Sequence, residues 1–228
     1  MNDKERIQEI VSTLKKRQVE YKLKYYKPYK FQKDFHKAGK NANQRLLMAA
    51  NRVGKSYVGA MEMAMHLSGE YPDWWEGKKF KKPIRAWVCG ASNETTRDIC
   101  QKELFGQPDN PRDKGKGSIP KHLIGDTTRK PGVPNAHSSV IVKHISGGWS
   151  RVAFKAYEMG AEKFMGESID IIWLDEEPPQ DIYSQCITRT LDRKGQVYLT
   201  FTPENGMTEV VQNFTTDLKP LQALITAG

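Results

Sequence analysis

A short loop that follows an apolar stretch constrains the fold of this chain more than any other feature. Residues 46–50 are apolar, and they lead directly into the run Asn51-Arg52-Val53-Gly54-Lys55-Ser56-Tyr57. Where a strand turns into Gly-Lys-Ser at the start of a helix, backbone N–H groups and the helix N-terminus face phosphate groups. The lysine then reaches the outer phosphates, and the serine hydroxyl binds Mg²⁺. Apolar side chains recur at helical spacing over residues 57–67, so the sequence predicts a strand, loop and helix that bind a nucleotide.

The loop departs from the usual G-x-x-x-x-G-K-[ST] pattern at its first position, where Ala49 replaces glycine. Alanine is the smallest substitute, so we expect the loop to close with modest strain. Arg52 would lie close to the β- and γ-phosphates and can stabilise transition-state charge from within the same subunit. The alternative is a surface arginine packed on a neighbouring carboxylate. The residues expected to contact the nucleotide are Ala50, Asn51, Arg52, Val53, Gly54, Lys55, Ser56 and Tyr57.

A second element supplies the acidic groups that this chemistry needs. Residues 169–174 read as an apolar strand, and Asp175-Glu176-Glu177-Pro178 follows. We expect Asp175 to hold Mg²⁺ together with Ser56, either directly or through water. Glu176 would orient and polarise the attacking water, and would act with Lys55 and Arg52 as the catalytic group. Glu177 either supports these acids or faces solvent, and we favour solvent.

An aromatic and glutamine motif lies before the first strand and can hold an adenine ring. Tyr29 or Phe31 would stack on the ring, and the Gln32 amide would donate and accept at the base edge. In the alternative interpretation, Phe31 and Phe35 are core residues of a helix and Gln32 is solvated.

A third strand, predicted over residues 196–203, ends in Thr200-Phe201-Thr202-Pro203. Thr200 or Thr202 could bond the attacking water and couple the loss of the γ-phosphate to movement. Alternatively, they are the β-branched residues common in any strand. Arg189, near the end of the preceding predicted helix, could face the nucleotide or a neighbouring subunit.

The formal net charge of +9 over 228 residues suits an anionic partner such as nucleic acid, although many proteins are this basic. Basic residues crowd at 15–17, 22–30, 78–82 and 112–130. The three cysteines lack metal-ligand spacing, which indicates buried or free thiols. No apolar run approaches the roughly 18 residues of a spanning helix, so we expect no membrane contact.

The remaining segments give a coarse map of elements. We expect a helix over 3–24, a strand over 84–90 and a helix over 93–105, then a long loop over 106–137. An antiparallel pair over 140–145 and 150–156 would be joined by Gly147-Gly148. A helix over 179–190 precedes the third motif, and a helix followed by a tail fills 205–228.

This succession of motifs over residues 28–206 resembles the ATPase domain of the large terminase subunit of tailed bacteriophages. The Asn-Arg-x-Gly-Lys-Ser loop is its most specific piece. The resemblance implies an α/β fold, a P-loop NTPase of the additional-strand catalytic-glutamate type with a mainly parallel central sheet flanked by helices. It also implies ATP and Mg²⁺ as ligands, with Gln32 as the adenine glutamine, Asp175 and Glu176 as the acids, and Thr200 and Thr202 in the coupling motif.

The resemblance further implies a motor that moves double-stranded DNA into a procapsid in the host cell cytoplasm. Its partners would be the portal protein, the small terminase subunit and other copies of itself in a ring, although an isolated domain can be monomeric. Residues 1–40 would form a helical segment carrying the adenine motif, and 41–228 the ATPase core. The nuclease domain of full-length members is expected to be absent here. Two alternatives stay open: a helicase-like translocase, and a nucleotide-gated DNA-binding module without turnover.

Overall fold

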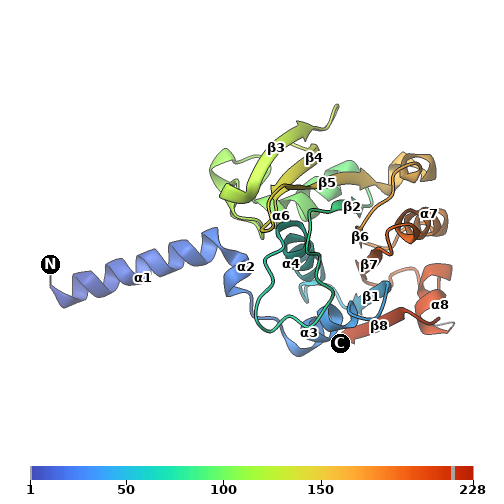
Figure 1. The fold of residues 1–228 in the computed structure, drawn as a ribbon, viewed down its shortest axis with the longest axis horizontal. Coiled ribbons are helices and arrows are strands. Elements are labelled where there is room, and N and C mark those ends of the chain that lie inside the picture. Colours follow the sequence, from blue (N-terminus) through green and yellow to red (C-terminus); the bar gives the residue numbers. More distant parts are fainter. Residues whose placement is uncertain (1, 217–218, 228) are drawn as a thin grey trace.

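A mixed sheet covered by helices on both faces forms the body of the protein (Figure 1). The computed structural model describes residues 2–216 and 219–227. Within these residues eight strands form one sheet. They are β1 Gln44–Ala49, β2 Arg85–Gly90, β3 Ile124–Arg129, β4 His137–Lys143, β5 Trp149–Ala156, β6 Ile171–Asp175, β7 Gln196–Phe201 and β8 Gln222–Ala227.

The strand order is β3-β4-β5-β2-β6-β7-β1-β8. Every pairing from β5 to β8 is parallel, and β3 and β4 extend the sheet through antiparallel pairings. Strand β7 lies between β1 and β6, so one additional strand separates the strand before the phosphate loop from the strand before the acids. Because parallel strands end at the same edge, β1, β6 and β7 bring all three motifs to that edge. The prediction of a mainly parallel α/β sheet of the additional-strand type is confirmed.

Two helical layers cover the sheet. Helices α3 (Lys30–Ala38), α4 (Lys55–Ser68) and α6 (Lys102–Phe105) bury their apolar side chains in one core cluster. Helices α7 (Gln180–Leu191) and α8 (Glu209–Thr215) bury theirs in a second cluster on the other face. Helix α4 is buried on nearly all sides, as expected for a helix whose residues are apolar all round.

A tight contact seats α4 on the sheet. A Cβ atom added at Gly59 would lie 2.5 Å from Trp173 Cε2, so only glycine permits this approach. The Trp173 ring stacks on Tyr198 with a centroid distance of 6.2 Å, and its indole Nε1 donates to Thr200 Oγ1 at 2.7 Å. The core thus fixes a hydroxyl that lies beside the acidic motif.

The N-terminal helix projects away from the body of the protein (Figure 1). Helix α1 covers Asp3–Glu20 and buries none of its residues, and α2 covers Lys22–Tyr25. The single helix predicted over 3–24 is therefore two helices, with a break at Tyr21, whose backbone leaves the helical region at φ −132° and ψ 49°.

Two further sequence predictions of elements are wrong. The expected loop over 106–137 contains strand β3, which escaped notice because its sequence Ile-Gly-Asp-Thr-Thr-Arg is largely polar and none of its residues is buried. The expected C-terminal tail contains strand β8, which pairs in parallel with β1. Positions 217, 218 and 228 of that predicted range lie outside the described residues.

Other predictions hold. Strands β4 and β5 are antiparallel, and Gly147 and Gly148 both take positive φ in the turn between them. The helix expected over 93–105 is present, with a π-helical stretch at Thr96–Gln101. All three cysteines are buried and free. Among the described residues, we find no helix whose length and apolar character would let it cross a membrane.

Candidate functional site

The phosphate loop and the acidic motif meet at the carboxyl edge of the sheet. Ser56 lies in the first turn of α4, and Asp175 is the last residue of β6. The Ser56 hydroxyl lies 3.0 Å from Asp175 Oδ1 and 3.1 Å from Oδ2. The Thr200 hydroxyl donates to Asp175 Oδ1 at 2.7 Å. The structure therefore brings Ser56, Asp175 and Thr200, which the sequence predicted separately, into one cluster.

Burial dominates the electrostatics of Asp175. It raises the pKa of this carboxyl to about 7, although hydrogen bonds from Thr200 and Ser56 oppose the shift. Because a carboxylate removed from water is costly unless a cation compensates it, the site favours a bound positive charge. A hydroxyl and a carboxylate are the hard oxygen donors that Mg²⁺ prefers. Ser56 and Asp175 therefore fit the metal site that the sequence predicted.

Lys55 links the loop to the third motif. Its Nζ donates to the Ala50 carbonyl at 2.9 Å and to Thr202 Oγ1 at 2.7 Å. Partial burial lowers the pKa of Lys55, while the negative charges of Glu176 and Asp175 oppose that shift. The Thr202 hydroxyl also lies 2.9 Å from Asn51 Oδ1. The loop and the Thr-x-Thr-Pro turn are thus joined through side chains.

The backbone of the loop explains why alanine is tolerated at its first position. Gly54 has φ 85° and Arg52 has φ 67°, so the left-handed conformations fall within the turn itself. Ala49 is the last residue of β1 and is paired with Ala227, in ordinary strand geometry. The sequence-based concern about strain at Ala49 is therefore removed.

Glu176 occupies a strained position directly after Asp175. Its φ is 66°, a left-handed conformation that non-glycine residues rarely adopt. Its backbone N–H donates to the Thr200 carbonyl at 3.1 Å. Partial desolvation raises the pKa of Glu176, Lys55 opposes that shift, and the charge of Glu204 adds to it. The carboxylate is thus held near Lys55 by a backbone that costs energy to maintain.

Tyr157, which follows β5, is a residue that sequence reasoning missed. Its buried hydroxyl lies 2.9 Å from the Asp175 carbonyl and 3.0 Å from the Glu176 carbonyl. It can donate to both oxygens and so hold the left-handed turn between the two acids. No motif marks this tyrosine, because its partners are backbone atoms.

Glu177 does not lie where the sequence suggested, and for Arg189 one of the two suggested positions is excluded. Glu177 accepts a hydrogen bond from the Thr208 hydroxyl, so the prediction that it faces solvent is wrong. Arg189 lies at the opposite edge of the sheet from the acids, because its carbonyl accepts from the N–H of Ile169, before β6 begins. It therefore does not face the loop of its own chain.

Arg52 is exposed at the tip of the loop, and it forms no ion pair within 2–216 or 219–227. The alternative in which a neighbouring carboxylate holds it thus has no support here.

The aromatic and glutamine motif that includes Tyr29 and Gln32 lies beside the loop that precedes α4. Gln32 is buried, and its Oε1 accepts from the backbone N–H of Tyr29 at 2.9 Å, so the alternative of a solvated glutamine is wrong. A Cβ atom added at Gly54 would lie 3.9 Å from Gln32 Nε2. The ring of Tyr29, 71% exposed, stacks with that of Phe31 at 6.3 Å between centroids. Phe35 is fully buried, as its core interpretation requires.

A buried charge cluster behind the loop also escaped sequence reasoning. Glu62 of α4 bonds His36 Nδ1 at 2.7 Å, Arg45 Nη2 at 2.5 Å and His66 Nε2 at 3.2 Å. Burial would raise the pKa of Glu62, but Arg45 and the histidine hydrogen bonds outweigh it and hold that pKa well below its usual range. The cluster ties α3, β1 and α4 together. Among the described residues, no group of three or more His, Cys, Asp and Glu side chains forms a metal cage.

Comparison with known proteins identifies the family. Residues 46–227 match the family model described as "Terminase large subunit, T4likevirus-type, N-terminal". The chain is 38% identical over 207 residues to the large terminase subunit of Salmonella phage P22. The chain belongs to the large terminase subunit family. It spans 41% of the length of that curated terminase relative, and the match covers 83% of the chain.

Solved terminase structures share the fold. The large terminase ATPase domain of Thermus phage P74-26 superposes with a TM-score of 0.59 at 16% identity, over 90% of this chain and 83% of that one. A large terminase from a thermophilic bacteriophage, solved in complex with ADP, gives a TM-score of 0.58 at 10% identity, over 86% of this chain and 44% of that one.

Proposed function

We propose that this chain is the ATP-hydrolysing motor part of a large terminase, which drives double-stranded viral DNA into a procapsid. The observation that carries the proposal is the contact between Ser56 and Asp175, because it joins the phosphate loop to the acidic motif. Family membership supports the same conclusion, since a matched relative is named a large terminase ATPase domain and another was solved with ADP.

Each residue of the site has a role in this proposal. Gln32 and Tyr29 hold the adenine, and the loop from Ala50 to Tyr57 surrounds the phosphates. Lys55 and the exposed Arg52 contact the outer phosphates, where charge builds in the transition state. Glu176 accepts a hydrogen bond from the attacking water and polarises it. Mg²⁺, held by Ser56 and Asp175, would neutralise phosphate charge when bound.

The contact between Lys55 and Thr202 suggests how hydrolysis is coupled to movement. Phosphate oxygens would compete with Thr202 for the ammonium group of Lys55, which lies 2.7 Å from that hydroxyl. If Lys55 bonded a phosphate oxygen in place of the Thr202 hydroxyl, the turn after β7 would be held less tightly to the phosphate loop. Thr200 would respond through Asp175, which it contacts directly.

Further features of the proposal come from the family alone. The motor would act in the host cell cytoplasm as a ring of copies on the portal protein, together with the small terminase subunit. Residues 1–40 would carry the adenine motif, and 41–228 would form the ATPase core.

The test measures ATP hydrolysis, with and without duplex DNA, alongside strand separation. We expect Mg²⁺-dependent hydrolysis without unwinding, and loss of both ATP binding and turnover in Lys55→Ala. Unwinding of the duplex would indicate a helicase-like translocase instead. ATP binding without turnover would indicate a nucleotide-gated DNA-binding module.

A further inference from the structure

Residues from all four basic clusters noted in the sequence lie along a series of connected hollows. A hollow of about 510 Å³ lies between the break after α1 and the segment that precedes β3. Tyr21 lines it from one side, and Arg112, Lys114 and Lys121 line it from the other. The rings of Tyr21 and His122 lie 5.7 Å apart, so the two segments are in contact.

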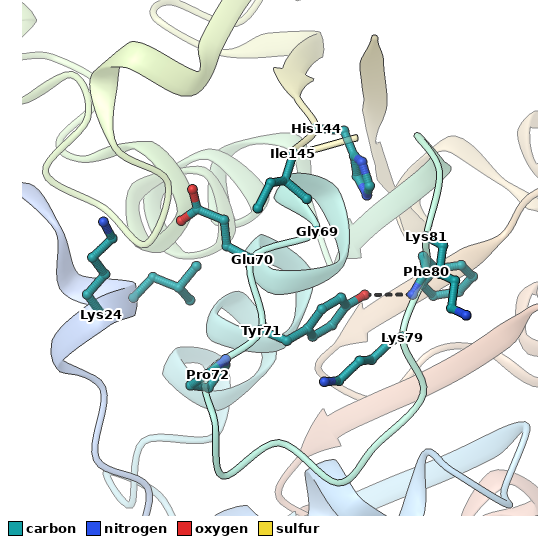
Figure 2. A pocket seen from close by; sticks show the side chains of 11 residues that line it. Lys24, Gly69, Glu70, Tyr71, Pro72, Lys79, Phe80, Lys81, His144 and Ile145 are labelled. Carbon is teal, nitrogen blue, oxygen red and sulfur yellow. Dashed lines mark hydrogen bonds between the residues drawn. The ribbon is translucent and has the colours of Figure 1, made fainter. Parts of the chain in front are cut away.

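This hollow continues into two others. Tyr21 also lines a hollow of about 340 Å³ together with Arg17 and Lys24. Lys24 in turn lines a third, of about 660 Å³, whose other wall carries Lys79. Figure 2 shows Lys24 on one side of this third hollow and Lys79 and Lys81 on the other. Eight lysines and arginines border the three hollows, and we call six of them the basic track: Arg17, Lys24, Lys79, Arg112, Lys114 and Lys121.

The charge of the basic track is not neutralised by the protein. All six side chains are exposed, and none forms an ion pair within the described parts of the chain. Lys116, close by, is different, since it pairs with Asp113 at 2.7 Å. Of the two acids that border the hollows, Glu20 lies 4.0 Å from Lys16, and Glu70 faces the third hollow. Crowded cations of this kind repel one another, and a bound polyanion relieves that repulsion.

The shape and chemistry of the basic track point to a long anion. Three linked hollows exceed what one phosphate group fills. The side chains are mainly lysines, which bind phosphates as point charges, and contacts to phosphate carry no sequence information. Such contacts are independent of sequence, as a motor that moves any DNA requires.

The basic track is also connected to the nucleotide site. Gly69 and Glu70, at the carboxyl end of α4, line its third hollow. The other end of the same 14-residue helix carries Lys55 and Ser56. A single buried helix thus joins the two regions.

We propose that the basic track holds the phosphate backbone of double-stranded DNA. The choice of double-stranded DNA as the partner rests on the proposed function. The position of the binding surface rests on the residues that line the three hollows. It adds α1, α2 and the segment before β3 to the surface that acts on DNA.

The test compares two variants of equal net charge. The first neutralises the track with Arg112→Gln, Lys114→Gln and Lys121→Gln. The control neutralises three exposed lysines elsewhere, with Lys102→Gln, Lys143→Gln and Lys163→Gln. The affinity of the full chain for a mixed-sequence 30-base-pair duplex is measured by fluorescence anisotropy over a range of salt concentrations.

We expect the track variant to bind the duplex about tenfold or more weakly at low salt. Its salt slope should fall by about 0.9 for each phosphate that the variant no longer neutralises. The control should keep the wild-type slope. A double variant of the track, Arg17→Gln with Lys24→Gln, should also bind the duplex more weakly than the wild-type chain and have a smaller salt slope. ATP hydrolysis without DNA should be unaltered in every variant, which verifies folding.

Equal binding by the track variant and the control would overturn the inference. So would wild-type protein that hydrolyses ATP but does not bind the duplex, a result that leaves the ATPase proposal standing. Wild-type protein that binds the duplex through the track but does not hydrolyse ATP would overturn the motor proposal alone.

Discussion

The Ser56 hydroxyl and the Asp175 carboxylate, 119 positions apart in the sequence, lie 3.0 Å from each other in the fold. This pair defines the site, because Asp175 ends β6 and Ser56 lies in the first turn of the buried helix α4. The acids, the phosphate loop and the threonine turn follow from the same strand order.

The stability of the metal-free protein should depend on the charge of Asp175. Its pKa rises from an ordinary 3.8 to about 7 in the fold, so the folded state binds the proton more tightly than the unfolded chain. The free energy of unfolding of the wild-type protein should therefore fall as the pH rises from the unfolded-state pKa toward the folded-state pKa of Asp175. The fall is up to about 1.4 kcal/mol per pH unit. Asp175→Asn should be more stable than wild type at pH 8 in EDTA, and this advantage should shrink at pH 5. Urea unfolding at both pH values measures it; an advantage independent of pH would refute the burial effect.

Arg52→Ala should slow hydrolysis with a smaller loss of ATP affinity. The side chain is exposed at the tip of the loop, and an arginine that acts on transition-state charge contributes roughly 10³- to 10⁵-fold to kcat. Steady-state turnover and equilibrium ATP binding separate the two effects. An unchanged kcat would place this role on another arginine, such as Arg189 of a neighbouring subunit.

Tyr157→Phe should lower kcat by about fivefold while ATP affinity stays within about twofold, since one hydrogen bond contributes roughly 1 kcal/mol. The hydroxyl that this change removes holds the carbonyls of Asp175 and Glu176, and so the direction of the Glu176 carboxylate. A purely structural role would lower thermal stability without changing kcat of the folded fraction. Turnover per folded molecule, with unfolding followed in parallel, distinguishes these results.

Gln32→Ala should reduce the preference for ATP over GTP. The amide is buried beside Gly54, where it can reach a base held by the loop. The ratio of kcat/KM for the two nucleotides is the informative quantity, because a general loss of stability lowers both values equally. An unaltered ratio would show that Gln32 serves only to hold the Tyr29 backbone.

The elements that the sequence predicted well are those in which chemistry restricts the residue type. Gly-Lys-Ser after an apolar strand, and paired acids after another, leave few alternative structures. Strand β8 could not be predicted in this way, because its sequence Gln-Ala-Leu-Ile-Thr-Ala has no clear alternation. It becomes a strand by pairing with β1, far away in the sequence.

The same limit applies within the site. Asp175 and Glu176 could be identified from the sequence, but the left-handed backbone at Glu176 could not. The Tyr157 hydroxyl stabilises this turn by a hydrogen bond to a backbone carbonyl, which no sequence motif reveals. The Glu62 cluster joins residues of three elements that no local pattern relates. Tertiary contacts of this kind depend on strand order, which the motifs imply only in outline.

The most direct test of the account compares turnover and ATP binding in Glu176→Gln with those in Glu177→Gln, the adjacent acid that bonds Thr208. If the phosphate loop and the acid pair act on one nucleotide, Glu176→Gln should still bind ATP but hydrolyse it about 10²- to 10⁴-fold more slowly. Glu177→Gln should keep most of its activity. Persistent turnover in Glu176→Gln, or an equal loss in both variants, would contradict the account.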